Sequence, residues 1–198
     1  MNYDNKRIAG LLLFVAAVQF VLVVVISEAI YSGYSVGQQY VSDLGDWNLA
    51  GNSAAIYDAS IILAGTLLFA SAYFIQRGFK NRLFTTLLIM SGIGMFVVGV
   101  VAENIFLPVH EAFTLVALIF GAASAIMSYK FEKSPLSYVS VILGAVTLLA
   151  MVFSLSGANL GLGKGGMERL VIYPFLLWVL GFGAYLIGNS SDTATTKT

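Results

Sequence analysis

The chain has 198 residues, of which 59% are hydrophobic and only 10% are charged, and its mean hydropathy is +0.88. Water-soluble domains carry roughly 25% charged residues, so this composition excludes the soluble class. The formal net charge is zero, which excludes the basic surface of a nucleic-acid-binding protein. Cysteine is absent, which excludes disulfide bonds, thiolate nucleophiles and cysteine metal sites.

Apolar segments recur along the whole chain, and each is long enough to cross a hydrocarbon core of ~30 Å as a helix. Helices are expected because lipid offers no water to satisfy open backbone groups. The sequence therefore predicts an all-α fold, a polytopic membrane protein built as a bundle of six transmembrane helices. A single domain is expected over residues 1–198, with a flexible cytoplasmic tail at 189–198. The six predicted spans are 8–30, 54–76, 82–102, 109–129, 136–156 and 168–188.

The basic residues predict how the chain is oriented. If six helices alternate, two basic residues, Lys164 and Arg169, fall on one side of the membrane. Lysine and arginine accumulate on the cytoplasmic side of membrane proteins. We therefore expect a multi-pass protein of the cell membrane with both termini cytoplasmic. The other eight basic residues fall on the cytoplasmic side: Lys6, Arg7, Arg77, Lys80, Arg82, Lys130, Lys133 and Lys197.

The acidic residues gather on the opposite, outer side. Acidic residues contribute little to topology, so insertion does not explain this concentration. It is the main functional hint in the sequence. The seven outer acidic residues are Glu28, Asp43, Asp46, Asp58, Glu103, Glu111 and Glu168.

The stretch from Glu103 to Glu111 holds the only histidine, His110, between two carboxylates. Ionisable groups beside lipid are costly, so they mark a function or pair with one another. His110 and Glu103 are the candidate catalytic residues, with His110 able to carry a proton. The alternatives are structural. Glu111 suits the positive end of a helix dipole that begins after Pro108, and His110 could be a satisfied interfacial histidine.

Two further charged residues complete the candidate site. Asp58 lies about one turn inside the second span, where a carboxylate must be paired, protonated or exposed to a water-filled cavity. Arg169 follows Glu168 at the start of the sixth span, and we expect it to form an ion pair with Glu103, Glu111 or Asp58. Its alternative role is to bind an anion or a lipid headgroup. The predicted ligand-binding residues are Asp43, Asp58, Glu111, Glu168 and Arg169.

The first outer loop, residues 31–53, is the longest connection and is rich in Tyr and Trp. We expect it to lie across the outer mouth of the bundle as a lid or binding loop. Gln19, inside the first span, is predicted to form a hydrogen bond between helices. Small residues predict the close helix contacts, and they are Gly65, Gly92, Gly99, Ala117, Gly121, Ala125, Gly181 and Gly188.

Several familiar motifs are missing from the chain. One histidine and no cysteine make an ordinary zinc site improbable, so we expect no metal site and no cofactor. Calcium or magnesium binding by carboxylates stays open. The glycine-rich stretch 157–164 departs from a phosphate loop, and no Gly-x-Ser-x-Gly elbow marks a hydrolase serine.

The chain resembles the prokaryotic membrane-protein family known as domain of unknown function 998. The resemblance rests on Val41-Ser-Asp-Leu-Gly-Asp46, Gly65, His110 with Phe113, and Gly166-Met-Glu-Arg169 followed by Trp178. It implies six helices and a shared set of outer polar residues, among them Asp43, His110, Glu168 and Arg169, and it implies no reaction. The layout is also similar to that of DRAM-type six-helix proteins, an analogy that suggests lipid-related biology.

The sequence thus favours an outward-facing pocket, built from the outer ends of spans two, four and six, that binds a lipid headgroup or a small cationic ligand. Whether the pocket also processes the ligand, and so whether the protein is an enzyme, stays open. Expected partners are membrane lipids and such a ligand. The alternative is a non-catalytic structural or assembly subunit, and a transporter or channel comes third because no repeat is evident.

Overall fold

The computed structural model describes residues 4–189, which form six α-helices, two short 3-10 turns and no strand. This confirms the predicted all-α fold. Each helix is long and apolar enough to cross a membrane. The predicted tail lies outside the described residues except for Asn189, the last residue of the sixth helix. The helices are α1 (Asn5–Ile30), α2 (Ala54–Phe79), α3 (Arg82–Val100), α4 (Glu103–Ser128), α5 (Leu136–Leu155) and α6 (Gly163–Asn189).

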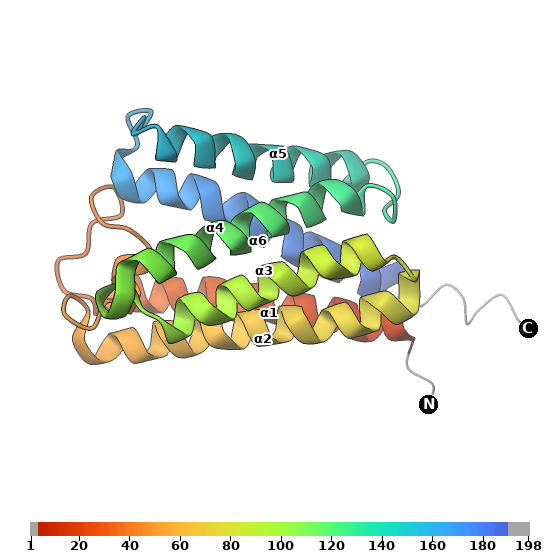
Figure 1. The fold of residues 1–198 in the computed structure, drawn as a ribbon, viewed down its shortest axis with the longest axis horizontal. Coiled ribbons are helices and arrows are strands. Elements are labelled where there is room, and N and C mark those ends of the chain that lie inside the picture. The colour runs from red at the N-terminus through yellow and green to blue at the C-terminus, as the bar shows by residue number, and fades with distance from the viewer. Residues whose placement is uncertain (1–3, 190–198) are drawn as a thin grey trace, which may run out of the picture.

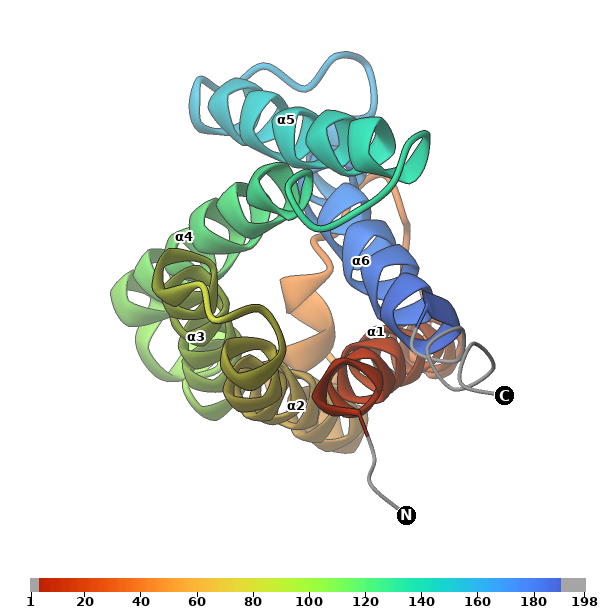
Figure 2. The same ribbon diagram turned by 90° about the vertical axis from the view of Figure 1, so that its right-hand side faces the viewer.

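Helices α1, α2, α3, α4 and α6 form a ring, and α5 packs outside it. α1 lies between α2 and α6, α3 lies between α2 and α4, and α4 contacts α6 to close the ring. α5 packs against α4 and α6 on the outer side (Figure 2). The chain's described ends lie together at one end of the bundle, which we call the termini end. The 31–53 segment lies at the opposite end, the loop end (Figure 1).

Local sequence signals explain where the helices begin and end. The Asp4 side chain accepts a hydrogen bond from the Lys6 backbone at 3.1 Å and so caps the start of α1. Asn81 caps α3 through the Phe84 backbone at 3.0 Å. These side chains satisfy backbone donors that have no partner within the helix. Lys80, with φ 53°, turns the chain sharply, so α2 and α3 are joined by only residues 80–81.

Close helix contacts use several of the predicted small residues. A Cβ on Gly65 would lie 2.5 Å from the Phe96 backbone nitrogen, and one on Gly92 would lie 2.8 Å from that of Phe69. Any side chain at either position would clash with the backbone of the other helix, so glycine is required where α2 crosses α3. Gly181 and Gly188 have open space around them, so their predicted packing role is wrong. The sixth helix instead approaches α1 through Gly183.

Gln19 confirms its prediction as a hydrogen-bonding residue between helices. Its amide nitrogen donates to the Ser60 carbonyl at 3.0 Å, and the Ser60 hydroxyl donates back to its amide oxygen at 2.7 Å. This reciprocal pair joins α1 to α2 and leaves both groups satisfied inside the bundle.

Aromatic side chains close the termini end of the ring. The connection between α4 and α5 places the Phe131 ring 4.5 Å from Phe79 and 5.0 Å from Phe84, centroid to centroid. Phe182 of α6 joins them, 5.7 Å from Phe84. We call these residues, Phe79, Phe84, Phe131 and Phe182, the aromatic plug. Such tilted and edge-on packing is favourable between rings and leaves a dry, filled space.

The loop end is closed by the chain between α1 and α2. Val41 and Leu44 in this segment are 0% exposed, so it folds into the mouth of the ring. Part of it is visible through the centre of the ring in Figure 2. The expectation that this segment lies across the mouth of the bundle is confirmed.

The start of α4 is kinked. The helix begins at Glu103, six residues before the predicted span, but Phe106 has non-helical angles of φ −157° and ψ 86°. Pro108 follows two residues later, and its backbone nitrogen has no hydrogen to donate to the preceding turn. The first turn, with Glu103, is thereby set apart from the main helix, which carries His110.

Candidate functional site

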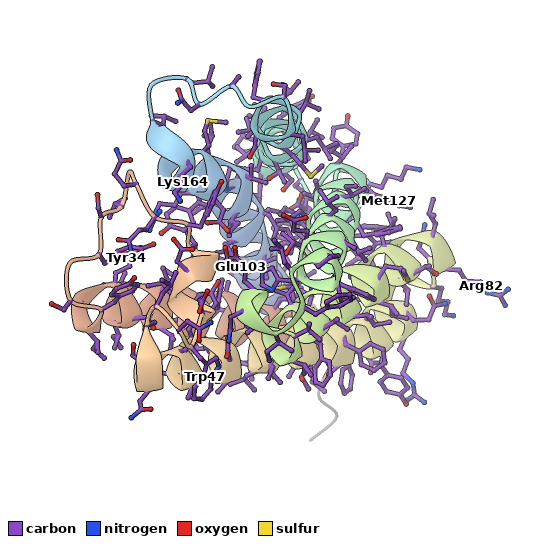
Figure 3. The ribbon with its side chains drawn as sticks, turned by 60° about the vertical axis from the view of Figure 1, so that its left-hand side comes forward. Tyr34, Trp47, Arg82, Glu103, Met127 and Lys164 are labelled. Atoms are coloured by element: carbon purple, nitrogen blue, oxygen red, sulfur yellow. The ribbon has the colours of Figure 1, made fainter. Side chains whose placement is uncertain are left out.

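A cleft of about 410 Å³ lies at the loop end between α4, α5, α6 and the 31–53 segment. We call it the acidic cleft, because three of its lining residues are glutamates and none is lysine or arginine. Figure 3 shows Glu103, Tyr34, Trp47 and Lys164 toward the loop end, with Arg82 and Met127 toward the other end. The polar lining residues are Tyr40, Ser42, Glu103, His110, Glu111, Thr114, Ser154 and Glu168.

His110 lies in the wall of the cleft and is 7% exposed. Its Nδ1 is 2.9 Å from the carbonyl oxygen of Val101. A carbonyl can only accept, so Nδ1 must carry the proton of this hydrogen bond. In the neutral ring Nε2 then holds the lone pair and is the atom that could take a proton.

The three glutamates of the cleft differ in their surroundings. Glu168, at the start of α6, accepts hydrogen bonds from the Val41 backbone and from Ser42. One carboxylate oxygen of Glu103, Oε2, is buried and has no hydrogen-bond partner among the described residues. Glu111 is exposed at the rim. A buried carboxylate oxygen without a donor is costly, so Glu103 is the member of the site that most needs a partner.

The cleft narrows toward the axis of the ring. A smaller cavity of about 50 Å³ continues inward between α1, α2, α3, α4 and α6. His110, Thr114 and Glu168 line both spaces, so they mark the junction between them. The inner space is otherwise almost wholly apolar, with Phe20, Met95 and Phe175 among its lining residues.

Arg169 does not line the cleft, and its predicted ion pair is wrong. Its partner is Glu28 of α1, with 2.5 Å between Nη2 and Oε1. The reason is the order of helices in the ring. Arg169 lies on the side of α6 that packs against α1, whereas Glu103 and Glu111 lie on α4 and line the acidic cleft, and Asp58 lies on α2. Arg169 also donates to the carbonyls of Val36 and Gly165, each at 2.9 Å.

Tyr34 completes this cluster, which we call the arginine clamp (Glu28, Tyr34, Val36 and Arg169). Its hydroxyl accepts from Arg169 at 2.7 Å and donates to the Tyr40 carbonyl at 2.8 Å. Burial is the main effect that raises the pKa of Tyr34, to about 12, so the hydroxyl keeps its proton. Four guanidinium hydrogen bonds are used within the chain, so the clamp holds the loop against α6 and occupies most of the donors of Arg169.

Asp58 and Asp43 lie outside the cleft and have structural partners. Asp58 accepts from the indole nitrogen of Trp47 at 2.8 Å, which ties α2 to the loop. Asp43 is buried and accepts from the Tyr40 backbone at 2.8 Å within the loop itself. Both help to shape the segment that covers the cleft. α5, and not α2 as predicted, forms the remaining wall.

Of the seven predicted site residues, the structure brings four together in the cleft: Glu103, His110, Glu111 and Glu168. Their chemical roles stay predictions. Sequence reasoning missed Thr114, although it follows His110 by one helical turn and so shares its face. It also missed Glu28 as the partner of Arg169, because no spacing in the sequence reveals that α1 and α6 are neighbours. In residues 4–189 no group of three or more His, Asp or Glu is placed to hold a metal.

A family model described as protein of unknown function, DUF998, matches residues 14–185. The chain belongs to the DUF998 family. The match reaches into all six helices and confirms the resemblance found in the sequence. Comparison with curated proteins and with solved structures gives no match. As a DUF998 member with six apolar helices, the chain is a multi-pass membrane protein in contact with lipid.

Proposed function

We propose that the acidic cleft binds a ligand through a positively charged group, either a small cation or the cationic head of a lipid. The observation that carries the proposal is the lining of the cleft. Three glutamates and His110 line it without lysine or arginine, and Oε2 of Glu103 is buried with no donor among residues 4–189. A positively charged group placed there would offset the negative charge of these carboxylates.

Electrostatics near lipid favour this interpretation. Carboxylates in a medium of low dielectric constant repel one another strongly, and attract a cation more strongly than they would in water. The only arginine at this end, Arg169, is already paired with Glu28 and cannot neutralise them. A bound cation would therefore offset the negative charge that the glutamates bring to one cleft.

Processing of the ligand is an extension of the same proposal. The lone pair on His110 Nε2 would let it accept a proton from a bound group, with the Val101 carbonyl holding the ring in that tautomer. If the cleft is catalytic, His110→Ala abolishes turnover while the protein still folds. If the protein is a structural subunit, no cation binds and the acids affect only stability.

We also propose that the cleft faces the outside of the cell membrane and that both termini are cytoplasmic. Seven of the described basic residues lie in or beside α1–α5 at the termini end, and two lie at the loop end. The chain has no cysteine, so a single cysteine introduced at Asn48 or at Lys130 gives a clean label. An impermeant thiol reagent added to intact cells should label the first and spare the second. The reverse pattern would overturn the orientation.

Binding is tested with tetramethylammonium as the probe, by calorimetry on the purified protein in a neutral detergent. We expect Glu103→Gln, which removes the charge and keeps the shape, to weaken binding about tenfold, the effect of losing one charged contact of about 1.4 kcal/mol. Asp46→Asn removes a charge at the same end outside the cleft and serves as the control. Equal losses in the two variants would show a general surface effect and contradict the site.

A further inference from the structure

We infer that the ligand of the acidic cleft is an amphiphilic cation that enters sideways from the membrane: a positively charged head with no phosphate, carried on a long apolar chain. This inference rests on the proposed cation binding and deepens it. It follows from three features of the cleft: half of its lining is apolar, no lysine or arginine lines it, and it opens toward the surface of the bundle.

The cleft is half apolar. Leu118, Met151 and Val171 are buried in its inner wall, and all three lie in membrane-spanning helices. Leu107, Leu115 and Leu155 extend this wall outward. A small hydrated cation would leave this surface uncovered. A chain of methylene groups would cover it, in line with the favourable burial of apolar area.

No basic residue lines the polar half of the cleft. The guanidinium of Arg169 is used in the arginine clamp, and the Lys164 ammonium lies 4.7 Å from the centroid of the Tyr40 ring without lining the cleft. A zwitterionic phospholipid head would bring its phosphate against Glu103 and Glu168. Like charges disfavour each other in such a site, so the lining selects against phosphate as well as for a cation.

The opening of the cleft lies between the start of α4 and the end of α5. The most exposed apolar lining residues are there: Leu107 is 43% exposed and Leu155 is 68% exposed. Glu111 and Ser154, also exposed, lie beside them on the same two helices. The apolar wall therefore continues onto the outer surface of the bundle, where lipid lies. An alkyl chain that is already in the bilayer can therefore enter the cleft without passing through water.

Three probes that share parts of one structure test the inference. Dodecyltrimethylammonium has the cationic head and the chain, tetramethylammonium has the head alone, and dodecylphosphocholine has the head and the chain with a phosphate added. Each is titrated below its micellar concentration against the protein in a neutral maltoside, and bound probe is counted by native mass spectrometry. We expect the first to bind at least about tenfold more tightly than either of the others, a difference of about 1.4 kcal/mol.

Two substitutions test where the alkyl chain of the probe binds. Leu155→Trp fills the opening at an exposed position, and Met151→Trp fills the inner wall. Either should abolish the advantage of dodecyltrimethylammonium over tetramethylammonium. Leu149→Trp, at a residue of α5 that is 59% exposed and does not line the cleft, is the matched control. Leu155 tolerates a larger side chain because it is exposed, so the test survives if Met151→Trp fails to fold.

The outcomes separate the two proposals. Equal binding of tetramethylammonium and dodecyltrimethylammonium would overturn the amphiphile and keep the cation site. Equal binding of dodecylphosphocholine would overturn the exclusion of phosphate. An advantage of the chain that survives both Leu155→Trp and Met151→Trp would overturn the lateral entrance. Failure of every cation to bind would overturn the proposed function itself.

Discussion

The two ends of this bundle are built from the same six helices but differ in their side chains: one end is packed with aromatic rings, and the other holds a cleft lined by glutamates. At the termini end, the aromatic plug fills the ring, and the Trp178 indole lies 5.6 Å from Phe182, centroid to centroid. Basic residues surround that end. At the loop end, three glutamates and His110 line a cleft that stays open at one side. One end buries apolar rings against one another, and the other gathers like charges that gain nothing from proximity.

This difference suggests that different ends of the bundle determine its stability and its ligand binding. Ring packing lowers the free energy of the folded chain directly. Clustered carboxylates raise it, and a protein keeps them only where another group compensates. The termini end therefore should control how stable the bundle is, and the acidic cleft should control what it binds. The arginine clamp is the exception at the loop end, because its charges are paired within the chain.

The largest expected effect is at the termini end. Phe84→Ala removes a ring that is 0% exposed and that contacts Phe79, Phe131 and Phe182. We expect a loss of about 3–5 kcal/mol in the free energy of unfolding. Chemical unfolding in mixed micelles measures it. Phe69→Ala, on a side chain that is 51% exposed, is the control and should cost far less. Comparable losses would mean that the plug is not packed as described.

Breaking the arginine clamp should come next. Arg169→Met leaves Glu28 without its cationic partner and removes the donors to Tyr34 and Val36. We expect a loss of about 3 kcal/mol, the lower range for a broken buried ion pair. Limited proteolysis within residues 31–41 should become faster because this segment loses its anchor.

Lys164→Met is the matched control for the clamp. Lys164 lies at the same end, is exposed, and places its ammonium 4.7 Å from the centroid of the Tyr40 ring. A cation beside an exposed ring contributes about 0.5–1 kcal/mol. Should both variants lose the same stability, the charge at this end would matter and the clamp geometry would not.

A smaller, pH-dependent effect is expected from Glu132 in the connection between α4 and α5. Burial is the main effect that raises the pKa of this carboxyl above its ordinary value of 4.5, and one oxygen, Oε1, has no hydrogen-bond partner within residues 4–189. A raised pKa in the folded state stabilises the protein below the ordinary value, and this contribution is lost as pH rises through the folded value.

The measurement is the unfolding temperature from pH 4 upward. The wild type should lose stability above its ordinary carboxyl pKa more steeply than Glu132→Gln, because the amide cannot ionise. Parallel curves for the two proteins would show that the Glu132 carboxyl does not titrate differently in the folded state.

The smallest expected effect on stability is in the cleft. Glu103→Gln should change the free energy of unfolding by less than about 0.5 kcal/mol, or raise it, because it removes a charge whose Oε2 has no donor. This is the same substitution that should weaken cation binding. A clear loss of stability with no change in binding would favour the structural subunit over the binding protein.

Much of the candidate site was predictable because it lies on one stretch of chain. Glu103, His110 and Glu111 meet in the cleft, as their spacing around the start of one helix suggested. Glu168 joined them because α6 begins at the same end as α4. Arg169 was assigned to the wrong acid, since neighbours in the ring cannot be read from helix order. Gly181 and Gly188 failed similarly, because small residues alone do not show which face of a helix has a partner.

The sequence by itself determined that this chain is a bundle of six membrane helices with its acids gathered at one end. Hydropathy and charge act locally, on each segment as it meets lipid, so they can be read without knowing the neighbours. Only the tertiary structure decided that α5 forms a wall of the acidic cleft, that Glu28 pairs with Arg169, and that Oε2 of Glu103 finds no donor among residues 4–189. These depend on which helices touch, and in lipid that choice is made by side-chain packing between segments far apart in the chain.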